Sequence, residues 1–279
     1  MAGVQNPSKR HHYVPKGYLK NFTNEHGHLS GYVKPSLSSF SQAKPKDLAV
    51  ENNFYTSIFR VNSTEIETRL NREFESPLLL VINQLISQVR LVNAELIDKL
   101  IITPDEKRAL AKFAVLQLVR SKHMRDSVLA SAPKYITSGM TLDAATLGKE
   151  GHLRVLEEHM NDGFRRLSDI LLCHRISFLT TTRLHPYWTS DDPVTLTRAV
   201  TNGKVGWGGV GLVDKNLELY LPLSWDIMLV FAGPYIGRPI PYVTKTSPEE
   251  VNERNRLIFS AAHKYAFSPR PITSPLNHS

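Results

Sequence analysis

The chain has 279 residues, of which 41% are hydrophobic, and a formal net charge of +8. This apolar content is enough for a sizeable core, but no run of 18 apolar residues occurs, so we expect no transmembrane helix and no membrane partner. A single cysteine, Cys173, excludes an internal disulfide framework and a cysteine-based zinc site. The first residues lack the apolar segment of a secretory signal, so we expect a cytoplasmic protein. Its positive charge favours polyanionic partners such as nucleic acid.

The segment from Arg10 to Phe22 combines two adjacent histidines with aromatic residues around a proline. Pro15 favours an extended backbone before it, so His11 and His12 are predicted to lie on a short strand and to point to opposite faces. The apolar residues after the proline have helical spacing and are predicted to pack as a turn against a helical block. We predict that His12 faces inward, because it lies closer to that turn. Such a histidine can act in chemistry or only as a buried hydrogen-bonding group.

The N-terminal section, residues 1–62, is predicted to contain short strands. Residues 28–33 alternate between apolar and polar side chains and follow a turn, which predicts a strand. The serine-rich residues 36–45 are predicted to form a loop. Residues 53–56 are predicted to be a further short extended piece.

A helical block is predicted for residues 63–173. Capping-box patterns with Thr64 and Thr103 as N-cap residues mark two helix starts, and a proline follows Thr103. The apolar residues recur at helical spacing, which predicts buried helices. The predicted helices cover residues 78–91, 110–119 and 153–172, and a loop with one weak helical turn covers residues 133–151.

Residues 174–279 are predicted to be β-rich, with a C-terminal helix that begins after Ser247. The predicted strands cover residues 176–182, 194–197, 217–221 and 227–231. Their connections are too short for parallel crossovers, so we expect an antiparallel sheet. The whole chain, residues 1–279, is therefore predicted to be one α+β domain. In it, a central helical block packs with an antiparallel sheet formed by N- and C-terminal segments.

Two lines of polar residues share faces of the helix predicted to begin near Thr64. The lines are Glu65, Arg69 and Glu73, and Glu67, Asn71 and Glu75. Spacing by four residues is typical of an exposed ladder of salt bridges. The functional alternative is that Glu65 or Glu73 turns inward and, with His12, holds a divalent cation such as Mg, Mn or Zn.

Arg120 ends an apolar helical run, and a buried arginine requires an anionic partner. Asp191 lies in an acidic turn before a proline, at the end of a strand, where sites are often assembled. We expect Arg120 to be buried and to meet Asp191 in preference to Glu73. The alternative is that Arg120 binds a phosphate of the substrate.

Several of these motifs together resemble a known family. They are His11-His12-Tyr13-Val14-Pro15, Asn53-Phe54-Tyr55, the helix around Glu65 and Glu73, Leu116-Gln117-Leu118-Val119-Arg120, Thr189-Ser190-Asp191-Asp192-Pro193, Tyr220-Leu221-Pro222-Leu223-Ser224, and Asn252 with Asn255. In content and order they are similar to the domain-of-unknown-function family numbered 4238. The family usually reads Ser-Asp-Asn-Pro where this chain has Ser190-Asp191-Asp192-Pro193, so Asp192 stands in place of the asparagine. The family has no established general activity, so the resemblance implies positions and not a chemistry.

Two hypotheses of function follow. The first is a nucleic-acid-directed hydrolase, a metal-assisted nuclease, in a bacterial defence or toxin context. Its site would use His11 and His12 as catalytic histidines, His12 also as a metal ligand, Glu65, Glu73 and Asp191 as further ligands, and Arg120 as a catalytic phosphate clamp. The second is a non-catalytic module that binds nucleic acid or protein, with these residues in a structural network. An enzyme requires these side chains in one cleft, whereas a scaffold lets them scatter.

Overall fold

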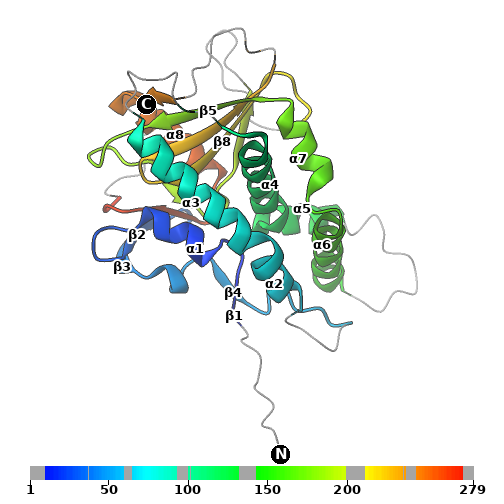
Figure 1. Cartoon of the computed structure of the whole chain (residues 1–279). Coiled ribbons are helices and arrows are strands. Elements are labelled where there is room, and N and C mark those ends of the chain that lie inside the picture. Colours follow the sequence, from blue (N-terminus) through cyan, green and yellow to red (C-terminus); the bar gives the residue numbers. More distant parts are fainter. Residues whose placement is uncertain are drawn as a thin grey trace, which may run out of the picture.

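The computed structural model describes residues 10–36, 38–59, 65–92, 100, 102–131, 143–198, 211–234, 236 and 243–272. The strands are β1 (Arg10–His12), β2 (Leu29–Val33), β3 (Ser38–Ala43), β4 (Val50–Asn52), β5 (Arg175–Thr180), β6 (Thr189–Ser190), β7 (Thr195–Arg198), β8 (Leu217–Ser224), β9 (Ile227–Ala232), β10 (Val243–Lys245) and β11 (Tyr265–Ser268). The helices are α1 (Lys16–Leu19), α2 (Glu65–Arg69), α3 (Ser76–Leu91), α4 (Pro104–Arg120), α5 (Lys122–Ser131), α6 (Ala144–Asn161), α7 (Arg165–Leu172) and α8 (Pro248–Ala261). Short turns of other helix types are η1 (Lys20–Phe22), η2 (Pro45–Asp47) and η3 (Leu70–Glu75). Figure 1 shows this α+β arrangement, as predicted.

The larger sheet has the strand order β10-β5-β9-β8-β7. Every residue of β8 and β9 is buried, because alternate side chains enter cores on opposite faces of the sheet. Leu219 and Phe231 join the core that contains α3, α4 and α7, whereas Tyr220 and Val230 join the core that contains α8. The β8–β9 hairpin is antiparallel, as predicted. The exception is β10, which runs parallel to β5; no short hairpin joins these two strands, so their relative direction is not constrained.

A second sheet, of order β3-β2-β11-β6, joins the two ends of the chain. Its strands are antiparallel, and β2 from the N-terminal section lies beside β11 from the C-terminal section. This pairing confirms the prediction that both chain ends contribute to antiparallel β-structure. The first strand, β1, pairs separately with β4.

Two predictions for the N-terminal section are wrong. Residues 38–43 of the predicted loop form β3, an edge strand whose residues are largely exposed, so no apolar alternation marks it. Residues 53–56, predicted to be extended, form a turn in which Asn53 has φ of 58°. Asparagine tolerates this left-handed conformation better than most residues do. The short strand lies just before the turn, in β4.

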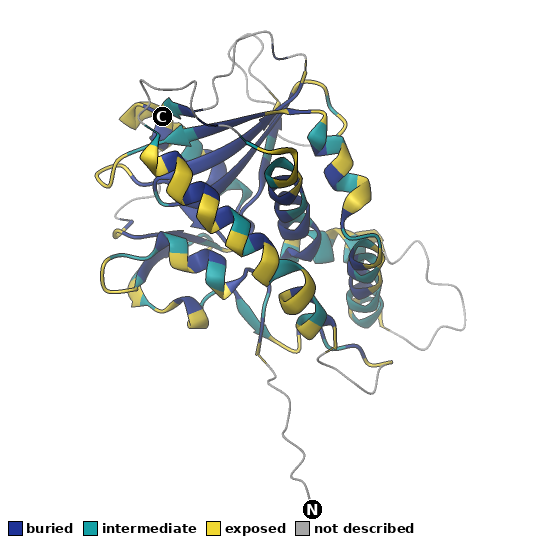
Figure 2. Ribbon diagram, in the orientation of Figure 1, coloured by how far each residue is buried: buried dark blue, intermediate teal, exposed yellow. Residues whose placement is uncertain are grey.

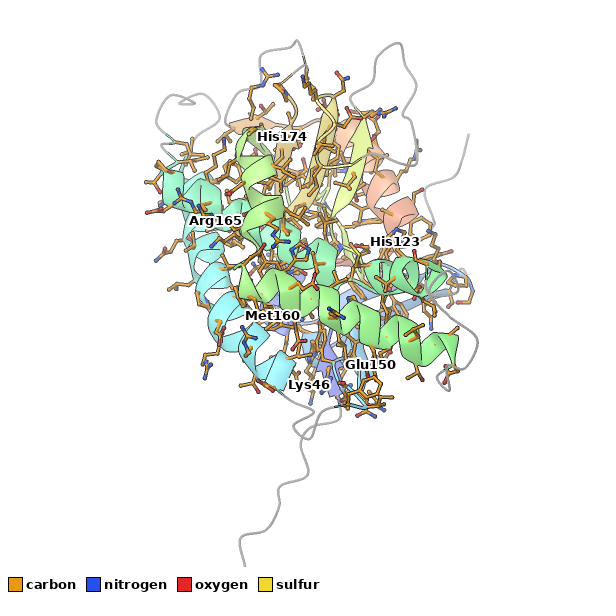
Figure 3. All side chains as sticks on the ribbon, turned by 90° about the vertical axis from the view of Figure 1, so that its right-hand side faces the viewer. Lys46, His123, Glu150, Met160, Arg165 and His174 are labelled. Carbon is orange, nitrogen blue, oxygen red and sulfur yellow. The ribbon has the colours of Figure 1, made fainter. Side chains whose placement is uncertain are left out.

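The helix predicted for residues 153–172 is interrupted, and the loop predicted before it is partly helical. Helix α6 begins at Ala144, where the Asp143 side chain accepts a hydrogen bond from the Thr146 amide at 2.9 Å. It ends before Gly163 and Phe164, which have φ of 63° and 58°. Figure 3 shows α6 crossing this side of the molecule, with α7 rising from Arg165 toward His174.

The long helical segment at the front of the molecule contains an unusual turn. Helices α2 and α3 are joined through η3, a π-helical segment. Such segments are rare and often occur at functional sites. Figure 2 shows α3 with an exposed stripe on its outer side and buried residues on the other. None of the helices in the described ranges is both long and apolar enough to cross a membrane.

The helix-start signals are confirmed where they can be compared. Capping boxes form at Thr103 for α4 and at Ser247 for α8, each with a proline at the start of the helix. The predicted cap at Thr64 lies outside the described residues.

Candidate active site

The turn after Pro15 anchors the histidine strand, as predicted. Tyr18 and Phe22 are fully buried, and the Tyr18 ring lies 5.7 Å from the Phe113 ring of α4. The Tyr18 hydroxyl donates to the Pro222 carbonyl at 2.7 Å. The turn that follows β1 is thereby held between α4 and strand β8 of the larger sheet. In Figure 1, β1 and α1 lie beside α2, so histidines and carboxylates come from neighbouring elements.

His11, and not His12, is the inward-facing histidine. Its side chain is 1% exposed and stacks on Tyr55, with ring centroids 5.7 Å apart. The Tyr55 amide donates to Nδ1 of His11 at 2.9 Å, so in the neutral ring the proton is on Nε2. That nitrogen lies 3.4 Å from Oε2 of Glu67. The prediction that the two histidines point to opposite faces is correct, but the prediction that His12 is the inward one is wrong. These partners of His11 come from segments whose position the local sequence does not reveal.

His12 is partly exposed and lines a cavity beside β1. Burial lowers the pKa of His12 below its ordinary value; a hydrogen bond with the backbone of Lys46 partly opposes this, and the Arg120 charge adds to it. Because that bond favours the protonated ring, the ring is its donor. Among the described residues, Nε2 of His12 is buried without a hydrogen-bond partner.

Arg120 is buried, as predicted, but its partner is Glu75 and neither Asp191 nor Glu73. Its Nη1 donates to Oε1 of Glu75 at 2.5 Å, its Nη2 to the His12 carbonyl at 2.5 Å, and its Nε to the Tyr55 hydroxyl at 3.1 Å. The guanidinium thus joins three segments that are remote in sequence. Because each of its three nitrogens donates a hydrogen bond within the protein, Arg120 holds these segments together.

Glu67 and Glu75 form a carboxylate pair in different environments. Both line the cavity that His12 lines. Burial raises the pKa of Glu67 to about 7, and the negative charge of Glu75 adds to this effect. The Glu67 carboxyl group is therefore about half protonated near neutral pH. Glu75 forms an ion pair with Arg120.

The cavity has a volume of about 530 Å³. Its walls come from β1, α1, α2, η3 and the start of α3. They consist of His12, Lys16, Gly17, Glu67, Thr68, Asn71, Arg72, Glu75, Ser76 and Leu79. The lining combines cationic, carboxyl and imidazole groups in a space of the size that small ligands occupy.

The other predicted site residues lie elsewhere. Glu65 is exposed at the start of α2. Glu73 is exposed and pairs with Arg69 at 3.5 Å and with Arg72 at 2.8 Å, so it belongs to a surface ladder of salt bridges. Asp191 is buried at the second sheet, where its carboxylate oxygens accept from the Lys264 amide at 3.0 and 3.1 Å.

The predicted metal ligands are therefore not brought together. Across the described ranges, no group of three or more His, Cys, Asp or Glu side chains is placed to hold a metal ion. The oxygen and nitrogen atoms best suited to contact a cation in the cavity are those of Glu67, Glu75 and His12.

Sequence reasoning missed Glu67, Glu75, Tyr55 and Lys16 as members of the site. The line of Glu67, Asn71 and Glu75, spaced by four residues, was recognised, but it was interpreted as a surface ladder. Tyr55 belongs to a family motif, and this was the signal that pointed to it. Lys16 carries no signal beyond its position next to Pro15.

The raised pKa of Glu67 predicts a pH dependence of stability. Between about pH 4.5 and 7 the unfolded chain has released this proton while the folded protein retains it, so the free energy of unfolding falls as pH rises. Glu67→Gln should remove this loss and be more stable than the wild type by about 1–2 kcal/mol at pH 8 but not at pH 4.5. This is less than the full linkage value, because the side chain is 31% exposed. Urea unfolding at both pH values tests this, with exposed Glu65→Gln as the control. Parallel pH profiles for wild type and Glu67→Gln would contradict it.

Residues 10–271 match the family described as "Protein of unknown function (DUF4238)". The match covers nearly the whole chain, and the chain belongs to this family. No curated protein and no solved structure matches the chain.

Proposed function

We propose that this DUF4238 protein is a hydrolase that cleaves phosphodiester bonds of nucleic acid at the cavity beside β1. The observation that carries the proposal is the pairing of His12 with Glu67 in one cavity. The pKa of the imidazole is lowered, and that of the carboxyl is raised to about 7. Titratable groups whose pKa values are pushed in opposite directions are typical of an acid–base pair.

The roles follow from the protonation states. Neutral His12, whose side chain lines the cavity, is the general base that takes a proton from the attacking water. The oxygen of that water forms a bond to phosphorus, and the bond from phosphorus to the leaving oxygen breaks. Protonated Glu67 is the general acid that gives its proton to the leaving oxygen. Both residues return to their starting states by exchanging protons with solvent.

Charge favours a polyanionic substrate. Lys16 and Arg72 lie on the cavity walls, and both are exposed. They take the phosphate-binding role that the sequence suggested for Arg120. The formal net charge of +8 further favours association with nucleic acid. A divalent cation held by Glu67 or Glu75 would supply additional stabilisation of negative charge on the phosphate.

The second candidate function is a non-catalytic module that binds nucleic acid or protein. The observation in its favour is the buried network of Arg120, Glu75 and Tyr55, which ties together segments remote in sequence, as a structural network does. In that case the cavity would bind a ligand without changing it.

An activity screen separates the two functions. The purified full chain is incubated with end-labelled single- and double-stranded DNA and RNA, in EDTA or with Mg²⁺, Mn²⁺ or Zn²⁺. We expect cleavage of at least one polymer. The doubly substituted His12→Ala, Glu67→Gln protein, purified identically, should show none. Binding without cleavage under every condition, or equal cleavage by the double variant, would overturn the hydrolase proposal.

A further inference from the structure

A second cavity, of about 470 Å³, lies on the other side of the histidine strand. Tyr13, which follows His12 directly in the chain, is one of its walls. The other walls come from β3, β4, the start of α5 and the start of β11. The lining includes Phe40, Tyr265, Lys122 and Lys264, together with the carboxylates of Asp47 and Glu51. None of the catalytic roles above uses these residues.

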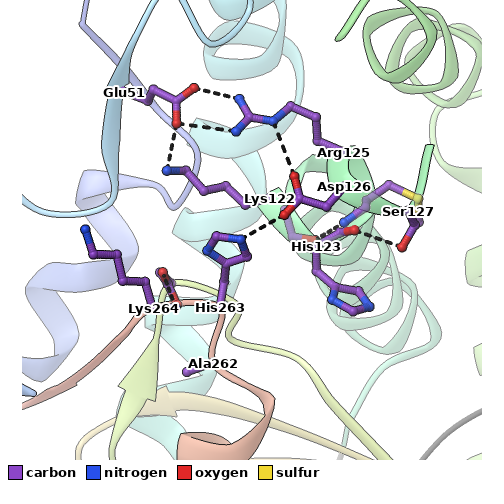
Figure 4. A network of polar contacts seen from close by, with 12 residues as sticks. Glu51, Lys122, His123, Arg125, Asp126, Ser127, Ala262, His263 and Lys264 are labelled. Carbon is purple, nitrogen blue, oxygen red and sulfur yellow. Dashed lines mark hydrogen bonds and ion pairs between the residues drawn. The ribbon is translucent and has the colours of Figure 1, made fainter. Parts of the chain in front are cut away.

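Two lysines, Lys122 and Lys264, line this cavity. Nζ of Lys122 lies 4.6 Å from the centre of the Tyr13 ring and 2.7 Å from Oε2 of Glu51, which also pairs with Arg125. Nζ of Lys264 lies 4.9 Å from the centre of the Tyr265 ring. Figure 4 shows Lys122 and Lys264 extending to the same side of the network, away from His263 and Asp126.

The lining contains two carboxylates, Asp47 and Glu51, and two ammonium groups. Asp47 pairs at 3.5 Å with Arg10, which is not part of the lining. Glu51 is shared by two cations, Lys122 and Arg125. Within the described ranges, Lys264 has no carboxylate within ion-pair distance. A positive charge is therefore available to an anionic ligand, and a phosphate group that bridges two ammonium groups is a common arrangement in proteins.

Aromatic rings form the apolar part of the lining. Phe40 and Tyr265 are both partly exposed, and their rings meet edge to face with centroids 6.5 Å apart. Tyr13 is almost fully buried beside them. Partly exposed rings next to ammonium groups suit a ligand that has both a planar ring and a phosphate, because stacking and charge act together.

The backbone of this cavity is held in a fixed shape. The Asp191 carboxylate accepts from the Lys264 amide, and the Asp191 amide donates to the Tyr265 carbonyl at 3.0 Å. On the opposite wall, Ala49 has φ of 49°, a left-handed conformation that alanine rarely adopts. Strained backbone of this kind persists where the surrounding structure enforces it, often at ligand sites. The role of Asp191 is thus to position Lys264 and not to bind a metal with His12.

We propose that this second cavity binds a nucleoside 5′-monophosphate, with the phosphate between Lys122 and Lys264 and the base against Phe40 and Tyr265. The site is separate from the cavity beside β1 and does not require that the protein be a hydrolase. Binding measurements alone therefore test this proposal.

Isothermal titration of the full chain with adenosine 5′-monophosphate tests the proposal. We expect Lys264→Gln to weaken binding about tenfold, the loss of one charge-assisted hydrogen bond. Lys264 is exposed, so this change should leave the fold intact. Lys245→Gln, an exposed lysine on β10, is the matched control, and Lys16→Gln reports on the cavity beside β1; neither should change the affinity. Adenosine and inorganic phosphate should each bind more weakly than the nucleotide.

Several results would overturn it. One is an absence of binding at millimolar nucleotide. Another is an affinity that Lys16→Gln lowers and Lys264→Gln leaves unchanged, which would place the nucleotide in the first cavity. A third is equal affinity for adenosine and its monophosphate, which would remove the role of the ammonium groups.

Discussion

Replacing Arg120 by methionine is expected to lower the free energy of unfolding by about 3–5 kcal/mol. The guanidinium is 1% exposed and donates to Glu75, to the Tyr55 hydroxyl and to the His12 carbonyl. Methionine fills much of the volume but leaves the Glu75 carboxylate without its cation and the other acceptors without a donor. An uncompensated charge beside a low-dielectric interior is the main cost. Urea unfolding at pH 7 measures it.

Two companion variants separate the buried charge from the loss of volume. Arg72→Met removes an arginine from the exposed side of η3 and should change stability by no more than about 0.5 kcal/mol. The double variant Arg120→Met, Glu75→Leu removes the stranded carboxylate and should recover part of the loss, because an apolar pair can replace a buried ion pair. If Arg120→Met is as stable as Arg72→Met, the network does not hold β1 to the helices.

The sequence predicted that the remote motifs meet in the fold better than it predicted which of their residues pair with each other. The histidine motif, Tyr55 and Arg120 were all marked by family resemblance, and the structure brings them into contact. Contact between these motifs could be expected, because buried polar residues require hydrogen-bond partners. The choice between Glu73 and Glu75 could not be made in the same way. Residues spaced by four share a helix face, so both charged lines satisfied the rule equally.

The π-helical turn explains why that choice failed. The η3 segment spans Leu70–Glu75, and such a turn changes the angle at which the residues around it leave the helix. No propensity rule predicts where it occurs. The prediction that His12 faces inward was wrong for a similar reason. His11 takes the inward position, where it contacts the Tyr55 amide and Glu67, and both of these belong to other parts of the chain. Tertiary contacts decide both questions.

The edge strand β3 shows a different limit. Its residues are mostly exposed, so its pairing with β2 depends on backbone hydrogen bonds and leaves no apolar pattern. By contrast, β8 and β9 were predicted well, because continuous apolar residues on both sides of a short turn specify a buried hairpin. Burial on both faces leaves a strong pattern, and an exposed edge leaves almost none.

If the protein is a hydrolase, Glu67→Gln is expected to lower its rate about 10²- to 10⁴-fold, the contribution typical of a general acid. Glutamine keeps the size of the side chain but has no proton to give. The wild-type rate should fall above about pH 7, where Glu67 loses its proton. This alkaline decline should be absent from the residual activity of Glu67→Gln. The wild-type rate should also fall at acid pH, below the lowered pKa of His12, because the protonated ring is no longer a base.

His12→Ala is expected to cause a loss of similar size with thermal stability nearly unchanged. Nε2 of His12 has no partner among the described residues, and Lys46, whose backbone bonds the ring, is exposed and can bond to water instead. A purely structural His12 would instead leave the rate intact and cost about 1–3 kcal/mol of stability. Glu65→Gln lies two residues before Glu67 on an exposed face, and His26→Ala replaces a histidine whose side chain is 74% exposed. Both should keep the wild-type rate and pH profile. Full activity in Glu67→Gln, with the alkaline decline retained, would show that this carboxyl group is not the acid.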